Sequence, residues 1–256
     1  MDAQSPKAEE LSLPQAFLLL ATDDKRGGPE VPAYLLRTTL AGAILAELDL
    51  IGAIDLHGRF VRVTGDAPQT DLQPELDLIR HKSRPHTPKR WVSMLESRAE
   101  VQRVYQGMAE RGLVDQVGEK RLGIFKTVRY PEKDHAPEAA LVQKIEAALT
   151  DKPGSAQAET ASAELRASEA VAADSAPSDA AVTAPTEPKA AGPQSVDPRT
   201  RALIALLHAS GLLEKLFPDA DRGRVGQLSG NFWPARAVED ELRMIRLAEA
   251  ESAIQA

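Results

Sequence analysis

The chain has 256 residues, with 38 acidic and 31 basic side chains, a net charge of −7 and no cysteine. The negative charge disfavours a protein that coats nucleic acid, and the lack of cysteine excludes thiolate metal sites, disulfide scaffolds and cysteine nucleophiles. The longest apolar run, 16–21, is far shorter than the roughly 20 residues of a membrane-spanning helix. We therefore expect any membrane contact to be peripheral.

Residues 1–10 are polar and acidic, without the apolar core of a signal peptide, and we expect them to be disordered. A first helix is expected after Ser12, because Pro14 suits the first turn and Gln15 completes a capping box. A second helix, over 33–50, is apolar nearly all round, which is typical of a buried central helix.

A short hairpin follows, because His57-Gly58 marks a turn between strands at 53–56 and 59–64. Helices are then expected over 71–80 and from Thr87, where a proline follows a favourable N-cap residue.

The next helix is predicted by an apolar stripe at helical spacing that ends at Gly112. A second hairpin is expected after it, with strands at 113–117 and 121–130 and the turn at Gly118. A further helix is expected around 141–149.

The segment 151–197 is rich in Ala, Pro, Ser, Thr and Glu and has no aromatic residue, so we predict a disordered linker. Its net charge of −5 leaves −2 for the rest of the chain. We expect 11–150 and 198–256 to fold together as one domain, because the apolar helices over 202–216 and after Pro234 need a surface to pack on. These patterns predict a mainly α fold, a helical bundle core with two small β-hairpins, one of them projecting.

No catalytic or cofactor motif is present. The sequence has no nucleophile elbow, no phosphate-binding glycine loop and no dinucleotide fingerprint, and none of its five histidines has a metal-binding spacing. His208 lies in an apolar stretch and is expected to be a core histidine. We therefore expect a non-enzymatic protein without a cofactor or a metal site.

The densest positive charge lies in 80–90, which contains no acid and is followed at once by Trp91. A cationic loop beside an aromatic suits an anionic headgroup or a phosphate backbone, with a solvated connection between helices as the alternative. Arg37 lies within the predicted central helix and needs a partner if buried. Two interpretations stay open: Arg37 pairs with Glu47 or another acid, or it lines an anion-binding pocket.

Twice in the chain a helix ends near a glycine and a hairpin follows, at 41–63 and at 104–128. This order of elements is also typical of winged-helix DNA-binding domains. Such a domain needs a basic recognition helix, yet the helix before the first hairpin is almost uncharged.

Several stretches carry a family resemblance. They are 11–20 (LSLPQAFLLL), 40–56 (LAGAILAELDLIGAIDL), the turn at 65–68, 91–95, 110–114 with its hairpin, and 202–217 (ALIALLHASGLLEKLF). With these stretches the chain resembles the Golgi phosphoprotein 3 family over nearly its whole length, apart from the linker and the ends.

The resemblance implies a helical fold around a central bundle, a peripheral membrane role and a projecting hairpin used in self-association. Eukaryotic members bind phosphatidylinositol 4-phosphate and hold glycosyltransferases in the Golgi. The implied hairpin here is 113–130, where Phe125 and Tyr130 would supply apolar contact. Lys126 and Arg129 would favour an anionic surface.

The family's headgroup pocket uses a tryptophan near the start of the second helix, an arginine within it, and two basic residues on the helix before the second hairpin. Here Pro32, Ala41 and Val101 stand at three of these positions and Arg98 at the fourth. The resemblance therefore implies Arg98 as a headgroup-binding residue. We expect nearby residues to assist it, namely Arg37, Tyr34, Arg90 and Lys89.

We thus expect an adaptor that binds anionic phospholipid headgroups, of the phosphatidylinositol 4-phosphate type, at the cytoplasmic face of a membrane. The expected partners are that membrane surface and further copies of the chain through the 113–130 hairpin, with no nucleic acid, and protein clients stay open. The alternatives are a winged-helix DNA-binding regulator and a protein–protein scaffold without lipid binding.

Overall fold

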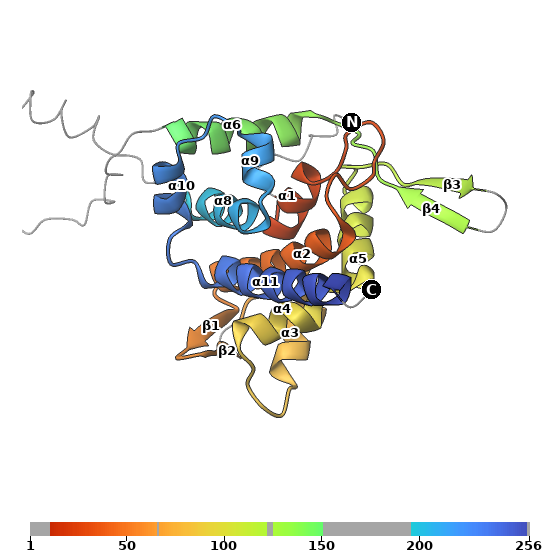
Figure 1. The fold of residues 1–256 in the computed structure, drawn as a ribbon. Coiled ribbons are helices and arrows are strands. Elements are labelled where there is room, and N and C mark those ends of the chain that lie inside the picture. Colours follow the sequence, from red (N-terminus) through yellow and green to blue (C-terminus); the bar gives the residue numbers. More distant parts are fainter. Residues whose placement is uncertain (1–10, 66, 122–124, 151–195, 255–256) are drawn as a thin grey trace, which may run out of the picture. The chain divides into compact units, whose positions relative to one another are not determined.

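The fold is described from a computed structural model over residues 11–65, 67–121, 125–150 and 196–254 (Figure 1). In this part of the chain it is mainly α, as predicted, with two antiparallel hairpins. The helices are α1 (Leu13–Leu20), α2 (Ala33–Leu50), α3 (Gln73–Arg80), α4 (Pro88–Leu95), α5 (Arg98–Glu110), α6 (Ala136–Thr150), α8 (Pro198–Ser210), α9 (Leu212–Leu216), α10 (Arg222–Ser229) and α11 (Trp233–Ile254). The strands are β1 (Ile54–His57), β2 (Phe60–Val63), β3 (Val117–Arg121) and β4 (Phe125–Arg129).

The described residues within 1–150 and 198–254 belong to one compact unit, which we call the first unit. The predicted disordered N-terminus and nearly all of the predicted linker lie outside the described residues. All elements named above belong to the first unit.

Helix α2 is the central helix of this unit, as its sequence predicts. It packs against α1, α4, α8 and α11 (Figure 1), and thirteen of its eighteen residues are buried. Burial on this scale argues against the winged-helix alternative, because a recognition helix has to present an exposed face to the DNA groove.

The helices after residue 196 are attached to α2 by a buried carboxylate. Arg199 of α8 donates from Nη2 to Glu47 Oε1 at 2.9 Å, and from Nη1 to Glu47 Oε2. The same Oε2 accepts the Leu13 N–H at 2.8 Å. Glu47 therefore joins α1, α2 and α8. It is bonded to Arg199 and not to Arg37, which excludes Glu47 as the acid that pairs with Arg37.

The two hairpins differ in how well the sequence predicts them. In β1–β2, His57 pairs with Phe60, so the turn falls within one residue of its predicted place. In β3–β4, Arg121 pairs with Phe125, and the predicted turn at Gly118 is wrong. Gly118 lies inside β3, opposite Val128. Glycine tolerates extended backbone as well as turns, so the residue alone does not fix the turn.

The sequence indicates Asp219 and Asp221 as helix-starting charges, and Asp221 does begin α10, where its Oδ1 accepts the Arg224 N–H at 2.7 Å and satisfies a donor of the first turn. One feature after residue 196 differs from expectation. His208 is exposed instead of lying in the core, because the buried run of α8 ends at Leu207.

Candidate functional site

The two arginines expected to bind a headgroup lie at one junction of helices. Thr38 Oγ1 in α2 donates to Glu96 Oε2 at 2.6 Å, which fixes the first half of α2 beside the connection between α4 and α5. Arg37 directly precedes Thr38, and Arg98 begins α5 two residues after Glu96. This hydrogen bond brings the stretches of backbone that carry Arg37 and Arg98 close together from distant parts of the chain.

Within the part of the chain that the structure describes, the side chains of both arginines lack a protein partner. Arg37 is half-buried and Arg98 is exposed, and within the described residues neither forms a side-chain hydrogen bond or ion pair. The acid at the junction, Glu96, accepts its hydrogen bond from Thr38. A half-buried guanidinium without a carboxylate has five N–H donors to satisfy, and an anion is the ligand that matches them.

Tyr34 shares a face of α2 with Arg37, because residues three apart on a helix are neighbours. Its side chain is half-buried in the first turn of α2. An aromatic ring at this place gives the junction one apolar wall beside the guanidinium.

Lys89 and Arg90 lie in the first turn of α4, which Thr87 caps by accepting the Arg90 N–H at 3.4 Å. Lys89 Nζ is 4.0 Å from Glu241 Oε2 of α11, so its charge is partly neutralised. The Arg90 side chain is exposed and makes no bond or ion pair in the described part of the chain. Of these two residues, only Arg90 is therefore available to an anion without breaking a protein contact.

The basic loop 80–90 is held in place at both ends. Arg80 pairs with Asp77 at 2.7 Å, and the His86 carbonyl accepts the Val61 N–H of β2 at 3.0 Å. The His86 ring also meets Trp91 edge-on, with ring centres 5.5 Å apart. Between these anchors Lys82 and Arg84 are exposed and have no acidic partner among the described residues. The loop therefore presents cations on a fixed backbone.

The structure describes the side chains of only some of the residues expected to make external contacts on the β3–β4 hairpin. Phe125 and Lys126 belong to β4, and their side chains lie outside the described set. Arg129, at the end of β4, donates from Nη1 to the Arg26 carbonyl at 3.3 Å. Tyr130 is buried and stacks on Tyr105, with ring centres 4.3 Å apart. Tyr130 is thus a core residue of its own chain at the base of the hairpin, and the external contact expected of it is wrong.

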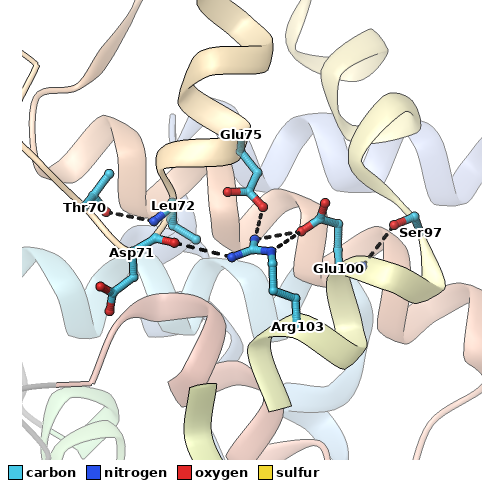
Figure 2. A network of polar contacts seen from close by, with 7 residues as sticks. All are labelled: Thr70, Asp71, Leu72, Glu75, Ser97, Glu100 and Arg103. Carbon is cyan, nitrogen blue, oxygen red and sulfur yellow. Dashed lines mark hydrogen bonds and ion pairs between the residues drawn. The ribbon is translucent and has the colours of Figure 1, made fainter. Parts of the chain in front are cut away.

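The network around Arg103 was not predicted from the sequence (Figure 2). Arg103 of α5 donates to Glu75 of α3, to Glu100 Oε2 and to the Asp71 carbonyl. Burial raises the pKa of Glu100 and lowers the pKa of Arg103. Only the Glu100–Arg103 spacing was visible in the sequence, because Glu75 reaches Arg103 through the tertiary fold. The network joins α3 to α5 and leaves Arg103 occupied.

A groove of about 570 Å³ lies beside this network, between the start of α1 and one face of α5. Arg103, Glu110 and Arg111 line it, so charges of both signs face the opening. Neither Arg37 nor Arg98 lines this groove, and the helix junction is a separate place on the molecule.

Comparison with protein families gives a match over most of the chain. The family model described as Golgi phosphoprotein 3 (GPP34) matches residues 13–245, and no individual curated protein matched the chain. Within the described residues, no helix combines the length and apolarity that crossing a membrane requires.

Proposed function

The chain belongs to the Golgi phosphoprotein 3 family, and from this premise we propose that it is a non-enzymatic peripheral membrane adaptor. It binds anionic phospholipid headgroups, of the phosphatidylinositol 4-phosphate type, at the cytoplasmic face of a membrane. The observation that carries the proposal is the pair Arg37 and Arg98, two guanidinium groups at one helix junction with no acid bound to either among the described residues.

Phosphate chemistry explains why this pair matters. A guanidinium binds phosphate oxygens through parallel N–H donors, and a charge-assisted contact contributes about 1.5–3 kcal/mol. Arg103 and Arg199 cannot serve in the same way, because each already binds a buried glutamate. The junction arginines bind a ligand without first breaking a protein ion pair.

The basic loop adds attraction that is less specific. Lys82, Arg84 and Arg90 are exposed, and each basic residue near an anionic membrane contributes about 1 kcal/mol. In this proposal the loop draws the protein to the surface and the junction selects the headgroup. The β3–β4 hairpin serves self-association, as the family suggests.

Vesicle co-sedimentation of the full chain tests the proposal. Three compositions are compared at low salt: phosphatidylcholine alone, with phosphatidylserine, and with phosphatidylinositol 4-phosphate. We expect no binding to the first, weak salt-sensitive binding to the second and the tightest binding to the third. Failure to bind either anionic vesicle contradicts the proposal. A mobility shift on DNA fragments in that case supports the DNA-binding regulator instead. If the chain binds neither vesicles nor DNA, the result supports the protein–protein scaffold.

A further inference from the structure

Three carboxyl side chains and one imidazole meet away from the helix junction, where the loop between α1 and α2 crosses the start of α6. The backbone fixes their approach, because the Glu132 N–H donates to the Asp24 carbonyl at 2.9 Å. His135 Nδ1 lies 2.5 Å from Glu132 Oε2 and 3.6 Å from Asp24 Oδ2. One donor atom from each of these three residues lies within 4.8 Å of the other two. Glu138, on the first turns of α6, is the fourth member.

Glu132 is the group that needs explanation. Its side chain is only 3% exposed, and its Oε1 receives no hydrogen bond from any described N–H or hydroxyl group. A buried carboxylate oxygen without a donor is costly, so such an atom calls for a missing partner. The carboxyl of Glu138 can supply a hydrogen bond to Glu132 only while it carries a proton.

A small cavity lies between these acids. It measures about 10 Å³, roughly the room of one water molecule or one ion. Asp24, Glu132 and Glu138 line it together, with Thr22 and Tyr130 among the other lining residues. Three carboxylates therefore border a space of the right size for a single cation.

The crowding of these acids also calls for positive charge. Asp24, Glu132 and Glu138 line one small cavity, and carboxylates this close repel one another unless a neutralising partner lies between them. A metal ion is such a partner.

We propose that Asp24, Glu132, His135 and Glu138 form a binding site for one divalent metal ion. Three carboxylates and one imidazole suit Mn²⁺ or Zn²⁺ better than Mg²⁺ or Ca²⁺, which take oxygen ligands throughout. Metal–ligand distances of about 2.0–2.2 Å require donors about 3–4.5 Å apart, so the spread of the Asp24, Glu132 and His135 donor atoms needs only small side-chain rotations.

The site joins three segments: the 22–31 loop, the stretch that leaves β4, and α6. It shares no residue with the Arg37–Arg98 junction, so it does not depend on the proposed lipid binding. The sequence shows no metal-binding spacing, because Asp24 lies far from the other three residues in the chain. Glu132, His135 and Glu138 follow one another at intervals of three residues, which match no common metal-binding motif.

The full chain, freed of metal with a chelator that is then removed, is titrated with MnCl₂ or ZnCl₂ at pH 7.5. Calorimetry is expected to give one bound ion per chain. As a direct second readout, the electron paramagnetic resonance signal of free Mn²⁺ is expected to decrease as the ion binds. Thermal unfolding is expected to shift upward by about 5 °C at saturating metal. Glu132→Gln/Glu138→Gln is expected to abolish both effects, whereas Glu146→Gln, an exposed position on the same helix, keeps them.

The metal-free Gln variant supplies a separate check. Replacing two crowded carboxyl groups by neutral amides is expected to raise its melting temperature above that of the metal-free wild type, while its response to metal disappears. If the double variant does not fold, the exposed His135→Ala variant is measured instead and is expected to weaken binding at least tenfold. Absence of saturable binding by the wild type overturns the site, as does unchanged binding in a folded variant.

Discussion

Arg199 of α8 binds Glu47 of α2 through both of its terminal guanidinium nitrogens, Nη1 and Nη2, although the two residues lie 152 positions apart in the chain. Because Glu47 also accepts the Leu13 N–H, the parts of the chain before and after the 151–197 segment share one buried carboxylate. This contact explains how helices on either side of that segment form a single unit.

Glu47→Ala is expected to lower the free energy of unfolding by about 2–4 kcal/mol, because Arg199 and the Leu13 N–H lose their acceptor. Urea denaturation measures the change. Glu239→Ala, at an exposed position on α11, serves as the control and is expected to stay within about 0.5 kcal/mol of the wild type. An equal loss in both variants contradicts this role of Glu47.

Gly42→Ala is expected to destabilise the protein by about 1–3 kcal/mol. A Cβ at this position of α2 would lie 2.1 Å from Val238 Cγ2 of α11, so the two helices would have to move apart. Val238→Ala in the same chain is expected to recover part of the loss. Gly107→Ala on α5 is the matched control, because nothing lies within 4 Å of its added Cβ. The control is expected to leave the free energy of unfolding unchanged or to raise it by up to about 1 kcal/mol. Urea denaturation measures both variants, and a larger loss of stability in Gly107→Ala than in Gly42→Ala contradicts the packing of α2 on α11.

Tyr105 is expected to make stability fall at high pH. Burial raises its pKa to about 12, with the hydrogen bond between Tyr105 and Thr22 opposing the shift, whereas in the unfolded chain the phenol has a pKa of about 10. Its contribution is therefore full below about pH 10 and is lost as the pH rises toward 12. Tyr105→Phe is expected to flatten this fall in urea denaturation at pH 8, 10 and 11. Identical slopes for the two proteins contradict the assignment.

Lys82→Ala/Arg84→Ala is expected to weaken binding to anionic vesicles by about tenfold or more and to reduce its salt dependence. Both side chains are exposed and unpaired in the described structure. Arg80→Ala in the same loop is the control, because Asp77 already pairs with Arg80, and it is expected to have the smaller effect. A larger effect from Arg80→Ala in co-sedimentation speaks against attraction by the loop.

Local patterns predict most of the fold. The apolar surface of 33–50 identifies α2 as the central helix, and the Ser12 N–H indeed bonds Gln15 Oε1 at 3.2 Å at the start of α1. Gly118 misleads because glycine suits a strand as well as a turn, whereas Asp221 is a favourable N-cap residue and begins α10 by accepting the Arg224 N–H.

The candidate sites are harder to predict, because their partners lie far apart in the sequence. Glu47 looks available to Arg37 within one helix, yet Arg199 from α8 takes it. Asp24 approaches Glu132 only through a backbone contact between two loops. Pairing across the fold, which residue spacing does not encode, decides which charged groups remain free for a ligand.

The most direct test of the central claim is the affinity of Arg37→Gln/Arg98→Gln for vesicles containing phosphatidylinositol 4-phosphate. Arg222→Gln is the control, at an exposed arginine of α10, which packs on α8. Loss of two charge-assisted contacts predicts binding about a hundredfold weaker than the wild type, with the control unchanged. Wild-type affinity in the folded double variant would contradict headgroup binding at this junction.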